Sequence, residues 1–223
     1  MNTGGYAYHV LNRAVARDAI FLKEEDYLAF EKALAEAHQR LPVRLLGYCL
    51  MPNHWHLVLW PERDGELSEF MRLLTVTHSQ RWHAHYHSAG TGPVYQGRFK
   101  SFPIERDDHL LTVLRYAERN PLRAKLVEKA ERWKWSSLFK HQAEALPSWL
   151  LPADSWPVHR RSDWVSWVNR AQNAKELEAL RQCIRRGRPY GSDTWVARTA
   201  KALGLQSTLR PPGRPKKKVE NRP

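Results

Sequence analysis

Two histidines separated by one residue, His54 and His56, are the first side chains in this sequence whose type and spacing could do chemistry. Residues two apart in a β-strand project from the same face. The apolar run 57–60 continues the strand pattern, and 51–53 before it has the composition of a turn. The two imidazoles would then supply half of a divalent-metal site. The alternative is a pair of sheet histidines that hydrogen bond to their neighbours.

Tyr116 and Asn120 form a second candidate pair. Residues 107–119 predict an amphipathic helix, and Tyr116 lies off its apolar stripe, which predicts a surface position that the packing of the helix does not require. Asn120 follows four residues later on the same face, so a phenol and an amide could converge on the histidines. Two alternatives stay open. Tyr116 could be an interfacial tyrosine facing water, and Asn120 could be the N-cap of a helix that begins at Pro121.

A rival cluster of histidines occurs at His83, His85 and His87. The surrounding pattern predicts a helix, in which residues two apart do not share a face. Only the first and the last of the three could pair, and no carboxylate or cysteine is close in sequence. We therefore interpret this cluster as a polar helix end.

The first two motifs resemble those of the single-tyrosine HUH transposases, and most closely those of the REP-associated tyrosine transposases. The resemblance covers roughly residues 5–140, and a similar tail begins at Arg186. The similar stretches, in the family's order, are Gly47–Asn53, His54–His56, Gln96–Ser101, Tyr116–Ala124 and Trp135–Ser137. The sequence departs from the family at Trp55, which is bulkier than the aliphatic residue usual between the histidines. That difference concerns the packing behind the strand.

The resemblance implies DNA strand cleavage and rejoining, in which Tyr116 attacks the scissile phosphate and leaves a 5′-phosphotyrosine and a free 3′-hydroxyl. It also implies Mg²⁺ or Mn²⁺ held by His54, His56 and Asn120, with single-stranded or REP-type hairpin DNA as the partner. A phenol of pKa ~10 is a weak nucleophile at neutral pH, so a Lewis acid on the phosphate would help. Two other functions remain open. One is a hairpin-binding repressor that does not cut, and the other is a hydrolase whose histidines activate water.

The charge of the chain favours a polyanionic partner. Of a net charge of +13, residues 181–223 carry +10, with twelve Lys or Arg against two acidic residues. A solvated basic end without a specific partner is the alternative. The predicted DNA-binding residues are Arg98, Lys100, Arg123, Arg185, Arg186, Arg188, Arg214, Lys216, Lys217 and Lys218.

Other compositional features exclude several classes of protein. Cys49 and Cys183 form no CxxC motif, so neither a disulfide framework nor a thiolate zinc site is expected. No GxxxxGK[ST] phosphate loop is present. The sequence has neither a signal-peptide pattern nor a long apolar run, so we expect a cytoplasmic, nucleoid-associated monomer or homodimer with no membrane partner.

The elements that must position these residues predict an α+β fold. The expected order is βαββαβα, which matches a ferredoxin-like, split-βαβ antiparallel sheet with helices packed on it. The expected strands are 6–12, 43–50, 54–60 and 93–104, and the expected helices are 24–40, 66–87, 107–119, 163–186 and 192–204. The expected domains are a catalytic domain (1–140), a Pro/Trp-rich connection (141–162), a basic helical DNA-binding extension (163–210) and a disordered basic tail (211–223).

Overall fold

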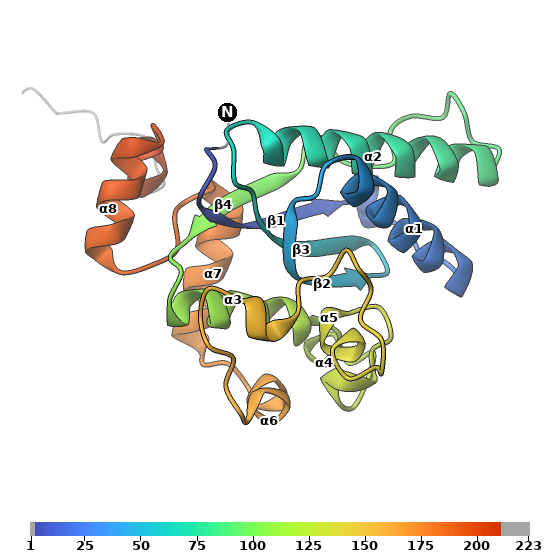
Figure 1. Ribbon diagram of the computed structural model, residues 1–223. Helices are drawn as coiled ribbons and strands as arrows, with labels where there is room; N and C mark the ends of the chain where they lie inside the picture. The colour runs from blue at the N-terminus through green and yellow to red at the C-terminus, as the bar shows by residue number, and fades with distance from the viewer. Residues whose placement is uncertain (1–2, 211–223) are drawn as a thin grey trace, which may run out of the picture.

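The computed structural model describes residues 3–210 and contains one four-stranded antiparallel sheet (Figure 1). The strands are β1 (Ala7–Arg13), β2 (Arg44–Met51), β3 (His54–Trp60) and β4 (Lys100–Ile104), in the order β2-β3-β1-β4. Helix α1 (Glu24–Arg40) joins β1 to β2 across β3, and α2 (Glu66–His85) joins β3 to β4 across β1. Each helix connection therefore skips one strand, which confirms the predicted split-βαβ layout.

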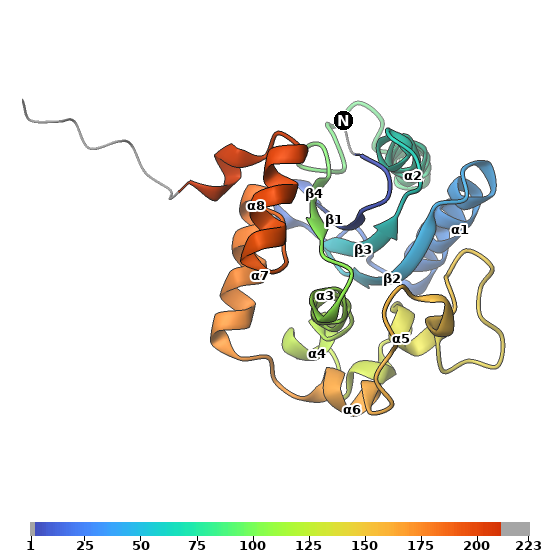
Figure 2. The same cartoon turned by 60° about the vertical axis from the view of Figure 1, so that its left-hand side comes forward.

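The two faces of the sheet carry different layers. Trp55, Leu57 and Leu59 of β3 belong to the core under α1 and α2, whereas Val58 belongs to the core under α3 (Asp108–Glu118). Figure 2 shows the sheet between these layers. Because strand side chains alternate, His54 and His56 lie on the α3 face together with Val58.

Trp55, the bulky residue between the histidines, is fully buried on the opposite face. Its indole Nε1 donates to the Tyr95 hydroxyl (3.1 Å), which in turn lies 2.7 Å from Nδ1 of His78. The ring packs near Phe30, at a centroid distance of 5.7 Å. The bulky Trp55 is thus accommodated behind the strand, because the hydrogen-bonded pair Tyr95 and His78 gives its indole N–H a partner.

Helix α1 and strand β3 occupy the predicted ranges, but two other segments differ from the prediction. Only 100–104 of the expected strand 93–104 pairs regularly with β1. Earlier in this segment the N–H of Gln96 donates to the carbonyl of Arg13, the last residue of β1, and the carbonyl of Val94 accepts from Val15 beyond it. The expected helix 163–186 is broken into α6 (Trp164–Asn169) and α7 (Ala174–Arg186). The carbonyl of Arg170 at the break accepts hydrogen bonds from two guanidinium groups, those of Arg115 on α3 and of Arg119, the residue that follows α3.

The C-terminal extension packs on the α+β fold and is helical, as predicted. Trp164, Val168, Leu180 and Cys183 are buried in the core that contains α3. After α7 the chain pairs with the outer edge of β4 through a parallel bridge between Tyr190 and Ile104. Figures 1 and 2 both show α7 and α8 beside β4. The remaining elements are η1 (Val15–Arg17), α4 (Asn120–Arg123), η2 (Ala130–Arg132), α5 (Ser137–Lys140), η3 (Ala153–Ser155), α8 (Asp193–Ala202) and η4 (Gln206–Leu209).

Both cysteines are buried and free. Between residues 3 and 210, no helix is both long enough and apolar enough to cross a bilayer. The predicted DNA-binding residues Arg214, Lys216, Lys217 and Lys218 lie outside the described residues.

Candidate active site

The two histidines of β3 lie side by side on the face covered by α3. The ring centroids of His54 and His56 are 5.0 Å apart and the rings are nearly perpendicular. Each Nδ1 already has a partner. Nδ1 of His54 lies 2.6 Å from Oδ1 of Asn53, and Nδ1 of His56 lies 2.9 Å from Nε2 of His9 on β1.

The tautomer of His54 follows from its partner. The amide nitrogen of Asn53 donates to the carbonyl of Arg17 (3.0 Å), so its oxygen faces the histidine. An amide oxygen only accepts hydrogen bonds, and His54 therefore carries its hydrogen on Nδ1. This leaves the lone pair on Nε2 available to a ligand.

Asn120 lies directly against His56. Its Nδ2 is 2.5 Å from Nε2 of His56, and its Oδ1 accepts from Nη2 of Arg123 (2.6 Å). Asn120 is the first residue of α4, after the N-cap residue Arg119, and its side-chain atoms bond His56 and the Arg123 side chain rather than backbone N–H groups of the helix. The N-cap alternative is therefore wrong, because the amide is turned from the helix end into the site.

Tyr116 of α3 completes the group. Its ring lies edge-on to His56, with centroids 5.8 Å apart, and the Arg123 guanidinium carbon is 4.4 Å from the centre of the ring. The expected surface position is wrong, because the residue is only 6% exposed. The extension covers the outer side of α3, so almost the whole helix is buried, whereas the sequence pattern predicted one buried stripe.

Two contacts position α3, the helix that carries Tyr116. The carboxylate of Glu118 is fully buried and accepts from the Ser137 hydroxyl (2.6 Å) and from the Trp164 indole (2.8 Å), and the Ser137 hydroxyl oxygen also accepts from the backbone N–H of Tyr48 on β2 (3.0 Å). Burial raises the pKa of this carboxyl. The second contact is at Gly47, where a Cβ atom would come within 2.6 Å of a methyl group of Leu114. Only a residue without a side chain allows this close approach of helix and strand.

The site environment keeps the histidines neutral. Burial, followed by the nearby charges of Arg13 and Arg123, lowers the pKa of His54 to about 4. Burial, followed by the charges of its histidine and arginine neighbours, lowers the pKa of His56 well below its usual range. Burial also lowers the pKa of His9 to about 3. Neutral imidazole is the form that binds metal ions, so the two imidazoles fit a divalent cation here. The Asn120 amide would have to rotate to add its oxygen, because that oxygen accepts from Arg123 and Nδ2 faces His56.

A basic cavity begins beside the histidines. It has a volume of about 410 Å³ and is lined by four cationic side chains, those of Arg13, Arg98, Lys100 and Arg185. Arg13 is the cross-strand partner of His54. Of the other predicted basic residues, Arg123 lies in the site itself. Arg186 and Arg188 do not line this cavity, and Arg186 donates to the carbonyl of Ser207.

A larger groove of about 660 Å³ adjoins this cavity and shares Asn12, Gly97 and Arg98 with it. One wall is a mainly polar stripe of α2. Phe99 and Tyr95 contribute aromatic surface to the groove. The α2 residues along the groove are Ser68, Arg72, Thr75, Val76, Ser79 and Gln80.

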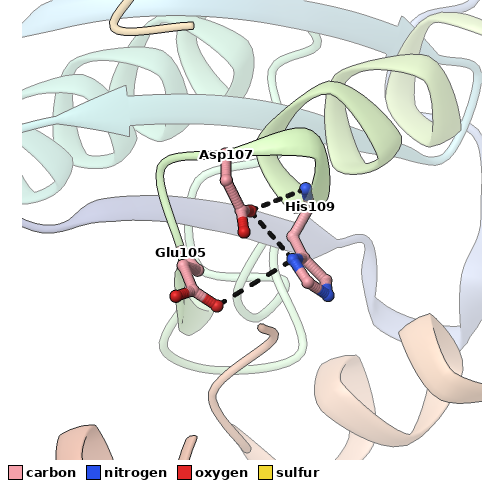
Figure 3. Close-up of side chains that lie close together, drawn as sticks. All are labelled: Glu105, Asp107 and His109. Atoms are coloured by element: carbon pink, nitrogen blue, oxygen red, sulfur yellow. Dashed lines mark hydrogen bonds and ion pairs between the residues drawn. The ribbon is translucent and has the colours of Figure 1, made fainter. Parts of the chain in front are cut away.

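Within residues 3–210, one cluster of His, Asp and Glu has its ligand atoms close enough together to hold a metal ion, and the sequence did not predict it. It consists of Glu105, Asp107 and His109 (Figure 3). Its atoms are already in use. Oδ1 of Asp107 accepts from the backbone N–H of His109 at the start of α3 (2.9 Å) and lies 2.8 Å from its ring Nδ1. Oε2 of Glu105 accepts from the backbone of Ser192 (2.6 Å). These contacts cap α3 and attach the extension.

The rival cluster 83–87 does not form a site. Helix α2 ends at His85, and Nδ1 of His83 is paired with the Ser88 hydroxyl at 2.9 Å. The residues that the sequence analysis missed are His9, Arg13 and Asn53. The only sequence signal for His9 was a histidine within an alternating strand, and nothing in the sequence pairs it with His56.

Comparison with known proteins identifies the family. The model of the family described as "Transposase IS200 like" matches residues 2–120, so this chain belongs to the IS200-like transposases, a family of DNA-processing enzymes. A search of curated proteins found no significant match.

Two solved structures are similar to this chain. One is the REP-associated tyrosine transposase bound to a REP hairpin, which shares 18% identity and a TM-score of 0.55, covering 72% of this chain and 95% of that chain. The other, from Deinococcus radiodurans R1, shares 17% identity at a TM-score of 0.38, covering 56% of this chain and 92% of that chain. The first similarity shows the same fold.

Proposed function

We propose that this protein is a metal-dependent single-strand DNA endonuclease and strand transferase that cleaves REP-type hairpin DNA through Tyr116. The observation that carries the proposal is the packing of the Tyr116 ring against His56, with the Arg123 guanidinium over the tyrosine ring. A nucleophile, two neutral imidazoles and a cation meet in one buried place. Membership in the IS200-like family and the hairpin bound by the solved relative support the same function.

In the proposed reaction, the Tyr116 oxygen attacks the scissile phosphorus and the bond from phosphorus to the 3′ oxygen breaks. The phenol loses its proton and the departing oxygen gains one, which gives a 5′-phosphotyrosine and a free 3′-hydroxyl. The phosphodiester linkage is conserved in the intermediate, so a second 3′-hydroxyl can reverse the step without a nucleotide triphosphate. The Arg123 guanidinium would stabilise the charge that develops on the phosphate.

His54 and His56 would hold the divalent ion through Nε2. Asn120 would add its amide oxygen as a third ligand after its amide rotates, because in this structure Nδ2 faces His56 and Oδ1 accepts from Arg123. When bound, the ion supplies Lewis-acid stabilisation of the phosphate oxygens. Imidazole nitrogens suit transition metals, whereas Mg²⁺ prefers oxygen ligands, so this mixed set favours Mn²⁺ over Mg²⁺.

The DNA path follows the two cavities. A strand leaving the histidines would place its phosphates among Arg13, Arg98 and Lys100. Unpaired bases would lie in the adjoining groove, where Phe99 offers a stacking surface worth about 1–3 kcal/mol per base. A protein acting on chromosomal palindromes is expected to associate with the nucleoid.

The decisive experiment is a covalent-adduct assay. Single-stranded hairpins labelled at the 3′ end, the portion that would stay joined to Tyr116, are incubated with Mn²⁺ and either the wild-type protein or Tyr116→Phe, then separated on a denaturing gel. We expect labelled protein and a 3′-hydroxyl fragment from the wild type only, and unchanged hairpin binding by the variant, because phenylalanine keeps the buried ring. A fully paired duplex should not be cut.

The alternatives predict different products in the same assay. A hydrolase would release a 5′-phosphate without labelled protein, and Tyr116→Phe would still cut. A repressor would bind the hairpin and leave it intact with either protein. Either result would overturn the proposal.

The metal ligands require a separate measurement. We expect EDTA, His54→Ala and His56→Ala to abolish cleavage while most hairpin binding remains. Asn120→Ala should weaken Mn²⁺ binding measured directly by titration, with the melting temperature of the same variant as a control for folding. Unchanged Mn²⁺ affinity would remove Asn120 from the site.

A further inference from the structure

His9, in the middle of β1, is a buried polar residue for which the proposed reaction gives no role. Its side chain is 1% exposed, and Phe102 lies against its ring at a centroid distance of 4.9 Å. A polar group in such a place is costly unless it has a hydrogen-bond partner. Its Nε2 lies 2.9 Å from Nδ1 of His56, which provides that partner.

One hydrogen must lie between these two ring nitrogens, because two lone pairs or two N–H groups at this distance would repel. The opposite side of His56 decides which ring carries it. Arg123 can only donate, so it fixes the oxygen of the Asn120 amide toward itself and leaves Nδ2 facing His56. Nε2 of His56 must then accept. The hydrogen of this ring is therefore on Nδ1 and points at His9.

We propose that His9 is a positioning residue, which accepts the Nδ1–H of His56 and so holds that ring in the tautomer and rotation that present Nε2 to a divalent ion. The inference rests on the metal site of the proposed function. Metal-binding histidines usually donate their second N–H to a carboxylate, a carbonyl or water, and losing that partner commonly weakens metal binding by about 10- to 100-fold. Here a second imidazole is the acceptor.

The tautomer is tested first, in the metal-free wild-type protein. Nitrogen-15 spectra of the histidine rings separate protonated from unprotonated nitrogens, and His56→Gln assigns the signal. We expect His56 to carry its hydrogen on Nδ1. A hydrogen on Nε2 in the metal-free protein would overturn the proposal whatever the protein does to DNA.

The consequence for metal binding is tested by titrating Mn²⁺ and following the loss of the signal of the free ion by electron paramagnetic resonance. His9→Phe removes the acceptor and should weaken binding by about 10- to 100-fold. His9→Gln places an amide oxygen near the position of Nε2 and should recover most of the affinity. Equal affinity of folded His9→Phe and wild type would overturn the role, as would failure of a folded His9→Gln to recover any of the lost affinity.

Two controls separate this role from general destabilisation. His78→Phe removes another buried histidine, on the opposite face of the sheet, and should leave Mn²⁺ affinity unchanged. His54→Ala removes a proposed ligand and measures binding elsewhere, including at Glu105 and Asp107. If the wild type binds no more Mn²⁺ than His54→Ala, the metal site of the proposed function and the role of His9 both fail. If the wild type binds and cleaves but His9→Phe binds equally well, only the inference about His9 fails.

Discussion

Arg123 contacts two of the side chains on which the proposed chemistry depends. Its Nη2 donates to the Asn120 amide oxygen, its guanidinium lies over the Tyr116 ring, and its buried Nη1 has no hydrogen-bond partner within the described part of the chain. A flat, multi-donor group can stack, hold an amide and still face a phosphate, whereas an ammonium group cannot do all three.

We therefore expect Arg123→Lys to lower the cleavage rate by at least about tenfold, as loss of a group that stabilises the transition state typically does. Hairpin affinity should change much less, because the charge is kept. Single-turnover cleavage and hairpin titration measure the two quantities. Arg132→Lys, at an exposed site paired with Glu128, is the matched control. An unchanged cleavage rate would show that a positive charge alone is sufficient at position 123.

At this scale the sequence predicted the main residues but not their supports. His54, His56, Tyr116 and Asn120 came from spacing and resemblance, and the structure brings them together. The burial of Tyr116 could not be predicted, because its ring packs against His9, His56 and Arg123, and the two histidines lie far away in sequence. His9 and Asn53 act through contacts whose geometry only the folded sheet provides.

At the scale of elements, the position of α3, the helix that carries Tyr116, depends on Gly47. A Cβ at this position would lie 2.6 Å from a Leu114 methyl group and 3.0 Å from the Ser137 hydroxyl. We expect Gly47→Ala to push α3 from the sheet and to cost about 1–3 kcal/mol, as overpacking typically does. Thermal unfolding measures the loss. Gly97→Ala, where a Cβ would meet nothing within 4 Å, should cost less. Equal melting temperatures of the two variants would contradict this account.

Elements with a local signal were predicted well, and those decided by distant contacts were not. Helix α1 has an acidic first turn, whose Asp26 accepts the backbone N–H groups of Leu22 and Lys23, and an apolar stripe that the structure buries. In contrast, at the break between α6 and α7 the Arg170 carbonyl accepts hydrogen bonds from the guanidinium groups of Arg115 on α3 and of Arg119 just after it. A residue pattern within 163–186 contains no information about donors from residues 115 and 119.

At the scale of the whole molecule, buried neutral histidines make stability depend on pH. Burial lowers the pKa of His78 to about 4, whereas an unfolded histidine titrates near 6.5. Between these values the unfolded chain binds a proton that the folded chain does not, so stability falls as pH decreases from 6.5 to 4. For His78 the loss is about 3 kcal/mol as an order of magnitude.

Urea unfolding at several pH values measures this dependence. We expect His78→Gln to show a shallower fall than the wild type across the same window, because it lacks the titrating ring. His38→Gln, which changes a half-buried histidine of α1, is a control with a smaller expected effect. Identical pH profiles for His78→Gln and the wild type would contradict the assignment.

The charge of the C-terminal end predicts a salt-dependent contribution to DNA binding. Leu180 and Cys183 are core residues, so a truncation that tests this charge must keep the chain to residue 210. Residues 211–223 contain five Lys or Arg and one Glu. Each phosphate contact that is lost should reduce the slope of log K against log[salt] by roughly 0.7–0.9.

The comparison is best made in the Tyr116→Phe background, so that binding is measured without cleavage. We expect the protein ending at Arg210 to bind hairpins more weakly and with a shallower slope. In the Tyr116-containing form it should still produce adduct at low salt. An unchanged slope would mean that these cations do not contact DNA.

The bridge between Tyr190 and β4 has a further consequence for self-association. Tyr190 bonds to the carbonyl of Pro103 and the N–H of Glu105, at one edge of the sheet. At the other edge, the carbonyl of Leu45 on β2 accepts from the N–H of Leu151, and the N–H of Leu50 donates to the carbonyl of Trp135. Exposed strand edges are where two copies of a protein can join their sheets into one. Here the chain's own later segments occupy part of both edges, so two copies could merge their sheets only after one of these segments had been displaced.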